Sequence, residues 1–260
     1  MVDVSAPPEP VEIKQISRDD VRDALRAGLA DFQKTPMLSL FFGLVFSLVG
    51  VVLALLLVRG GASYWVFPLA AGFPLIGPFA AVGLYEISRR IEAGEEVSLG
   101  PVLMAGFRSP HGQLPLFMVL AVIFFLAWIV LARVIFAVSF GTASMTNVMT
   151  SIEVFFTPQG LIMLAVGSLA GAALAALLFA ISVVGVPLLV DRDIDIVTAI
   201  ITSVRATIDN QSALAGWAVT VAVATIVAML PLFLGMVLVF PVLGHASWHL
   251  YRAMIPKDAP

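Results

Sequence analysis

The few charged residues of this chain leave long stretches that carry no charge at all. Each of the five longest exceeds the roughly 20 apolar residues that a helix needs to cross the hydrocarbon core of a bilayer. Because a charged side chain inside a bilayer is costly, this spacing indicates an integral membrane protein built from several helices. The uncharged stretches cover residues 35–58, 60–85, 109–132, 154–190 and 210–251.

The composition agrees with a membrane location. Of the 260 residues, 60 % are hydrophobic and 12 % are charged, whereas about 25 % of an ordinary soluble domain is charged. This argues against a soluble enzyme with a large polar cleft. A net charge of −3 without a basic run gives no reason to expect a nucleic-acid partner. The absence of cysteine excludes disulfides, thiolate metal sites and cysteine nucleophiles.

The last uncharged stretch, residues 210–251, is too long for one crossing. A single helix of that length would measure about 60 Å, roughly twice the hydrocarbon thickness, so two helices with a tight turn near Pro231 fit better. The sequence therefore predicts an all-α, six-span membrane domain over residues 16–255, between a disordered N-terminus (1–15) and a short tail (256–260). The six predicted spans cover residues 37–58, 63–86, 114–137, 160–189, 212–230 and 232–251.

The basic residues fall unevenly on the two sides of these spans. Twelve of the 14 Lys and Arg residues lie on one side, which the positive-inside rule makes the cytoplasmic side. Both termini are then cytoplasmic, and this requires an even number of spans. Four of the cytoplasmic bases are candidates for docking a partner, namely Arg89, Arg90, Arg192 and Arg205.

Several predicted cytoplasmic segments have the pattern of amphipathic helices. Ser17 and Asp20 have the spacing of a capping box, and apolar residues recur at helical spacing over residues 21–32. A comparable stripe covers residues 196–208, and residues 99–107 show it less regularly. We expect these helices to lie on the membrane surface or to dock under the bundle.

The amphipathic segments suggest an internal repeat. A gapless alignment of the first with the third pairs Ala24 with Ala199 and Gly28 with Ser203. This predicts three units, each an amphipathic helix followed by a transmembrane hairpin. The alternative is that any six-span protein alternates in this way.

The second predicted span contains a cluster of helix-breaking residues. Proline removes a backbone donor and glycine lowers helix propensity, so the first half of this span cannot be a regular helix. One interpretation is a broken helix whose free carbonyl groups line a solute path, and the other is a kinked packing helix. The residues concerned are Pro68, Gly72, Pro74, Gly77 and Pro78.

Two histidines, His245 and His249, lie four residues apart on one face of the last span. Imidazoles at this spacing can bind a metal or a haem, which makes them candidate cofactor ligands. The alternative is an interfacial belt that they form with Trp248, Tyr251 and Arg252. We expect no metal site and no bound cofactor.

Four segments resemble a known family, the predicted bacterial integral membrane proteins catalogued as domain of unknown function 2189. The resemblance implies a six-span protein of the bacterial inner membrane. Some members are labelled as relatives of cytochrome oxidase subunits, but a haem-copper subunit needs about six histidine ligands and this chain has three histidines. The segments are DALRAGLADFQKTP, FPLAAGFPLIGPFAAVGLYEISRRIEAGE, PLLVDRDIDIVTAIITSVRATIDN and PVLGHASWHLYR.

Three classes of function are compatible with these patterns. The first, which we favour, is a non-catalytic accessory or scaffold component of a membrane complex, with a membrane-protein partner or a second copy of the chain in the lipid bilayer. The second is a channel or facilitator for a small solute, and the third is an accessory protein of a respiratory oxidase. No hydrolase, metalloprotease or phosphate-loop motif is present, so we expect no enzyme.

Overall fold

Helices form all the regular structure in the part of the chain that the structure describes. The structure is a computed structural model, which describes residues 11–60, 65–107, 113–141 and 152–257. The segments predicted as a disordered N-terminus and a tail, residues 1–15 and 256–260, therefore lie partly outside the described residues. In chain order the elements are α1 (Arg18–Lys34), α2 (Pro36–Arg59), α3 (Val66–Gly72), η2 (Phe73–Ile76), α4 (Gly77–Ala80), α5 (Val82–Ala93), α6 (Leu99–Met104), η3 (Ala105–Phe107), α7 (Gln113–Phe140), η4 (Ile152–Phe156), α9 (Pro158–Ser182), α10 (Gly185–Asp191), α11 (Ile196–Asp209), α12 (Gln211–Met229) and α13 (Met236–Met254).

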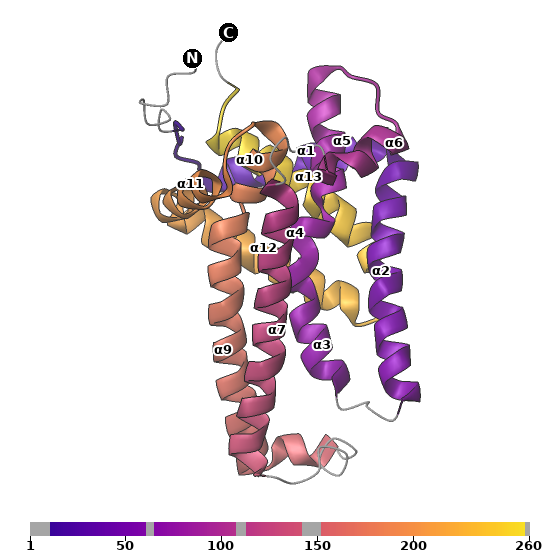
Figure 1. Cartoon of the computed structure of the whole chain (residues 1–260), viewed down its shortest axis with the longest axis vertical. Helices are drawn as coiled ribbons and strands as arrows, with labels where there is room; N and C mark the ends of the chain where they lie inside the picture. Colours follow the sequence, from indigo (N-terminus) through magenta and orange to yellow (C-terminus); the bar gives the residue numbers. More distant parts are fainter. Residues whose placement is uncertain (1–10, 61–64, 108–112, 142–151, 258–260) are drawn as a thin grey trace.

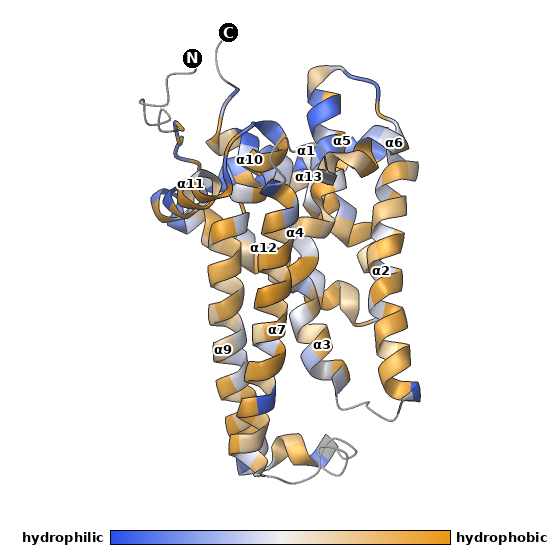
Figure 2. Ribbon diagram, viewed as in Figure 1, coloured by the Kyte–Doolittle hydropathy of each residue, from blue (hydrophilic) through white to orange (hydrophobic). Residues whose placement is uncertain are grey.

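The long helices run along the length of an elongated bundle (Figure 1). Five helical segments in the described residues are long and apolar enough to cross a membrane. The described chain begins and ends at one end of the bundle, which we call the terminal end, and hydrophilic residues gather there (Figure 2). We call the opposite end the far end. Three of the five segments are the single helices α2, α7 and α12. The other two are residues 68–93, which run from α3 to α5, and residues 158–191, which contain α9 and α10.

The sixth predicted span folds as helix α13 but is not among these five segments. Its first half is apolar, whereas its second half carries His245, His249 and Arg252. These polar residues lower the hydropathy of the helix as a whole. The all-helical membrane fold is thus confirmed with five candidate spans, and the count of six is not.

Helix α1 begins with the predicted capping box. The Ser17 hydroxyl accepts a hydrogen bond from the Asp20 amide, and the Asp20 carboxylate accepts one from the Ser17 amide at 2.7 Å. The buried face of α1 contains Ala24 and Gly28, which pack against α13. A Cβ atom on Gly28 would lie 2.5 Å from the Ala246 nitrogen, so the two backbones touch. Helix α1 is therefore docked on the bundle.

Helix α11 also has a side-chain cap and a face of small residues. The Asp195 carboxylate accepts a hydrogen bond from the Thr198 amide at 2.9 Å. Ala199, Ser203 and Ala206 are buried against α9 and α10. The Ser203 hydroxyl donates to the Ala180 carbonyl at 2.7 Å, which fixes the helix to the end of α9.

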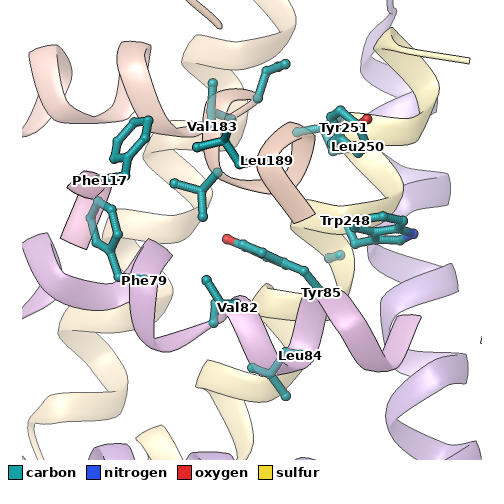
Figure 3. Close-up of a cluster of buried hydrophobic side chains, with 14 of the residues drawn as sticks. Phe79, Val82, Leu84, Tyr85, Phe117, Val183, Leu189, Trp248, Leu250 and Tyr251 are labelled. Carbon is teal, nitrogen blue, oxygen red and sulfur yellow. The ribbon is translucent and has the colours of Figure 1, made fainter. Parts of the chain in front are cut away.

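Aromatic rings fill the middle of the bundle. Phe46 of α2 stacks on Phe240 of α13 with ring centroids 4.1 Å apart, and Phe73 packs edge-on against Phe233 at 5.4 Å. The same buried core continues toward the terminal end, where it joins residues of α4, α5, α7, α10 and α13 (Figure 3). This part of the core holds the ends of α5, α10 and α13 together, and this positions the polar residues of the terminal end.

Candidate functional site at the terminal end

One ion-pair cluster lies at the end of α5. The Glu86 carboxylate, which is 4 % exposed, pairs with Arg89 at 2.7 Å and with Arg90 at 2.7 Å. Both arginines also pair with Glu95 in the turn after the helix. These two predicted docking residues are therefore engaged in contacts within the chain.

A second cluster joins α5, α10 and α13. The Arg252 guanidinium donates to Asp191 at 2.7 Å and to Glu92 at 3.2 Å. Asp191 also accepts a hydrogen bond from the Tyr251 hydroxyl at 2.6 Å, and Glu92 accepts one from the Trp248 indole at 3.1 Å. Burial and the charge of Asp191 raise the pKa of Tyr251 above its usual range. The cluster ties three helix ends together.

The belt interpretation of the aromatic residues in α13 is wrong. Trp248 and Tyr251 are 0 % exposed and lie inside the protein, where the Arg252 guanidinium covers the Trp248 ring at 5.0 Å from its centroid. A belt residue would face the lipid headgroups. The sequence shows the aromatic residues but not their partners, Glu92 of α5 and Asp191 of α10, which accept their hydrogen bonds inside the protein.

The two histidines of α13 have separate partners. His245 is fully buried, and its ring nitrogens lie 2.9 Å from the Ser39 hydroxyl and 2.8 Å from the Ser88 hydroxyl. His249 lies 2.7 Å from the Asp31 carboxylate. Burial alone would raise the pKa of Asp31, but the hydrogen bond and charge of His249 hold it below its usual range.

This arrangement limits what the histidines can bind. A neutral imidazole has one donor and one acceptor nitrogen, and both nitrogens of His245 already lie at a serine hydroxyl. A metal or haem at His245 would have to replace one of these hydrogen bonds. The described residues contain no group of three or more His, Cys, Asp or Glu side chains that could hold a metal ion. The geometry fits a polar joint between α2, α5 and α13.

The second predicted span is broken at the expected place. Helix α3 ends at Gly72, and a 3-10 turn and the short α4 follow before α5 begins. The Pro68 carbonyl accepts a hydrogen bond from the Trp128 indole at 2.7 Å. A Cβ atom on Gly72 would lie 2.5 Å from the same indole ring. Trp128 of α7 therefore packs into the first part of the break.

The other residues of the break are partly exposed. Pro74, Gly77 and Pro78 are half-buried, and a Cβ atom on Gly77 would meet nothing within 4 Å. The break thus has a packed part near Gly72 and a more open part near Gly77. The solute-path interpretation remains a prediction for the open part.

The other two candidate docking bases lie on either side of the start of α11. The Arg192 guanidinium donates to the Pro256 carbonyl at 2.9 Å and is engaged within the chain. Arg205 lies on the exposed face of α11. Large apolar residues share that face, with Val197, Ile201 and Ile208 at 61 %, 47 % and 58 % exposed.

The predicted apolar stripe forms only part of the inward face of α11. Ile196, Ile200 and Val204 are half-buried against the core and Ile208 is exposed, whereas the small residues Ala199, Ser203 and Ala206 are fully buried. Their spacing of four and then three residues is the signal that could have identified the inward face.

Comparison with known protein families gives a match over part of the chain. The sequence model of a family described as "Predicted integral membrane protein (DUF2189)" matches residues 66–191, from α3 to the end of α10. No curated protein and no solved structure matches the chain. Helices α1, α11 and α13 lie outside the matched range. The resemblance to the DUF2189 family of predicted integral membrane proteins is thus confirmed over residues 66–191.

Proposed function

We propose that this integral membrane protein is a non-catalytic accessory or scaffold component of a membrane complex, and that α11 is its docking helix. The observation that carries the proposal is the outer face of α11. A helix at the polar end of a membrane protein exposes Val197, Ile201 and Ile208 together, beside Arg205. Such an apolar face with a charged residue fits a protein partner.

The composition of α11 favours a protein partner over lipid headgroups. A helix that lies in the membrane interface usually carries several Lys or Arg residues on its polar face. Helix α11 has one basic residue, Arg205, and ends at the acidic Asp209. In Figure 1 the helix lies across the bundle axis and extends outward beside α9, where a second protein could reach it.

The polar residues of the terminal end support a structural role over a catalytic one. Glu86, Asp191 and Arg252 are held in ion pairs, and His245 lies between two hydroxyl groups. In the described residues every buried side-chain nitrogen or oxygen atom has a hydrogen-bond partner. A catalytic centre usually keeps a reactive group free for its substrate. These contacts support the proposal that the protein is not an enzyme.

The positive-inside rule supports a cytoplasmic location for the terminal end, in a bacterial inner membrane. The described chain begins and ends there, so it returns to its starting side, as an even number of predicted spans requires. The three-unit repeat has support from α1 and α11. The aligned pairs Ala24 with Ala199 and Gly28 with Ser203 all lie on buried helix faces.

Purification in mild detergent tests the accessory role. We expect a stoichiometric partner to copurify with the native chain and to be lost from Ile201→Gln. The matched control is Leu29→Gln, because Leu29 is also an exposed apolar residue, at 46 %, but lies on α1. We expect this control to retain the partner.

Liposome experiments separate the accessory role from the facilitator. A clean monomer or homo-oligomer that carries a small solute across liposome membranes would contradict the accessory role. In that case, replacement of Gly77 in the open part of the helix break should reduce the flux. A purified protein with a Soret band or a bound metal would instead support the oxidase accessory.

A further inference from the structure

The turn between α12 and α13 is made of apolar residues and faces away from the protein. Leu230, Leu232 and Leu234 are 76 %, 74 % and 63 % exposed. Each leucine left in water would forgo roughly 1.5–3 kcal/mol of burial free energy. The turn after α5, at the terminal end, carries Glu95 and Glu96 instead. The turn at 230–235 therefore has the composition of a segment surrounded by lipid chains.

Both ends of the α12–α13 hairpin lie at the terminal end. The Asn210 side chain, at the start of α12, donates to the Lys14 carbonyl at 3.3 Å. The Lys14 amide in turn donates to the carbonyl of Met254, the last residue of α13, at 2.8 Å. The hairpin thus enters and leaves the membrane region on the same side.

Helix α13 runs antiparallel to α2, and their contacts fix the depth of the turn. Near the terminal end, His245 lies 2.9 Å from the Ser39 hydroxyl. At the other end of the contact, the Ser47 hydroxyl donates to the Phe233 carbonyl at 2.8 Å, and the Phe233 ring lies against Gly50. The hairpin therefore reaches no farther along α2 than about Gly50.

Helix α2 continues well past this point. Gly50 is 14 residues from Pro36 and nine residues from Arg59, which correspond to about 21 Å and about 14 Å of helix. The charged Arg59 closes α2 at the far end. The hydrocarbon core is about 30 Å thick, so the turn ends near the middle of the bilayer. In Figure 1 the chain between α12 and α13 likewise turns well before the far ends of α2, α7 and α9.

The polar contacts of α13 leave only a short part of it for the hydrocarbon. From residue 245 onward the side chains of the helix meet serine and carboxylate groups of the terminal end. The apolar part, residues 236–244, has nine residues and measures about 13 Å. This is less than half of the hydrocarbon thickness.

The backbone of the turn is largely paired, as a position inside lipid demands. The Phe233 amide donates to the Met229 carbonyl at 3.0 Å, the Leu234 amide donates to the Pro231 carbonyl at 3.1 Å, and the Ser47 hydroxyl bonds the Phe233 carbonyl. Pro231 has no amide hydrogen that would need a partner. Leu232 and Phe233 adopt positive φ angles of 51° and 64°, an unfavourable conformation for such residues, and the turn contains no polar side chain.

We propose that α12 and α13 form a re-entrant hairpin that dips into the bilayer from the terminal side and ends in the middle of the hydrocarbon. Its tip, Leu230, Leu232 and Leu234, contacts lipid acyl chains. The chain then crosses the membrane four times, through α2, α3 to α5, α7, and α9 with α10, whereas α12, although long and apolar enough to cross, does not. This topology has an even number of crossings, as the distribution of the basic residues requires.

Single cysteines test the hairpin, because the native chain contains none. The variants are Leu232→Cys and Leu230→Cys at the tip, with Glu96→Cys at the terminal end and Gln159→Cys at the far end as exposed controls. Sealed vesicles of both orientations are treated with a membrane-impermeant maleimide. We expect Glu96→Cys to be labelled from one side, Gln159→Cys from the other, and the tip variants from neither.

A lipid-depth measurement identifies what covers the tip. A fluorophore on Cys-substituted position 232 should be quenched more by lipids that carry a nitroxide near the chain end than by lipids that carry it at the headgroup. Labelling of either tip variant from the same side as Gln159→Cys would overturn the hairpin and restore six spans. A disulfide between two copies at position 232, without lipid quenching, would overturn the lipid contact. Unchanged elution of the variants from a sizing column shows that they are folded.

Discussion

Helices α1 and α11 occupy similar positions but differ in what they expose. Both lie at the terminal end, begin with a side-chain cap and bury small residues. The outer face of α1 carries exposed ion pairs, Arg22 with Asp19 and Arg26 with Asp23. The outer face of α11 carries isoleucine and valine.

The inner faces differ as well. Helix α1 contributes the buried carboxylate Asp31 to the pair with His249, and its Gly28 touches the backbone of α13. Helix α11 uses the Ser203 hydroxyl to bond the end of α9. Helix α1 is therefore specialised for contact within the chain, whereas α11 keeps an apolar surface that is not used for contact within the chain.

The largest effect should come from Gly28→Leu. A Cβ atom there would lie 2.5 Å from the Ala246 nitrogen and 2.7 Å from its Cα, and neither backbone atom can move without shifting α13. We expect the free energy of unfolding to fall by about 3 kcal/mol, the upper range for overpacking. Denaturant unfolding in detergent measures it. The matched control is Gly216→Leu on α12, where a Cβ atom meets nothing within 4 Å, and an equal loss there would refute close packing of α1.

The next effect concerns the charge that α1 buries. We expect Asp31→Asn to lower the free energy of unfolding by about 1.5–2 kcal/mol at pH 7, because it weakens the charged hydrogen bond to His249. The pKa of Asp31 in the fold lies below its ordinary value of 3.8. Its stabilisation is therefore complete above pH 3.8 and is lost as the pH falls through the lower pKa of the folded state.

Thermal unfolding across the acid range checks this pH dependence. The native chain should lose stability below about pH 4 more steeply than Asp31→Asn does. Asp209→Asn is the control, since Asp209 is an exposed carboxylate on α11. If Asp31→Asn and the native chain lose stability in parallel, the carboxylate does not stabilise the joint between α1 and α13.

A smaller effect should follow from loss of the α11 cap. Asp195→Ala removes the acceptor of the Thr198 amide and should cost about 1 kcal/mol. Hydrogen exchange of the peptide over residues 196–209 should become faster in this variant. Ser17→Ala is the matched change in α1, where the contact with α13 should restrict faster exchange to the first turn. Equal acceleration along both whole helices would remove the distinction between α1 and α11.

Much of the fold can be predicted from local patterns. The capping box at Ser17 and Asp20 and the break after Gly72 depend on neighbours in the sequence, and both occur as expected. The pairing of Glu86 with Arg89 likewise depends on helical spacing. Features of this kind need no knowledge of which helices meet.

The rest depends on contacts between distant segments. The position of His245 between Ser39 and Ser88 joins residues more than 150 positions apart, and no spacing rule identifies such partners. The depth of the hairpin depends in the same way on Ser47 and Phe233. Small residues recur at every third or fourth position of α2, at Ser39, Gly43, Ser47 and Gly50. This row is the only local sequence feature that indicates the close contact of α2 with α13.

The smallest effect on stability, and the most informative for the comparison, should come from Ile201→Gln. Its side chain is 47 % exposed on the outer face of α11, so we expect the free energy of unfolding to change by less than about 0.5 kcal/mol. The same unfolding assay measures this, with Ala199→Gln as a control on the fully buried face. If Ile201→Gln destabilises the protein as much as Ala199→Gln does, the outer face packs within the protein and is not free for a partner. Native stability combined with loss of the copurifying protein would instead separate docking from folding.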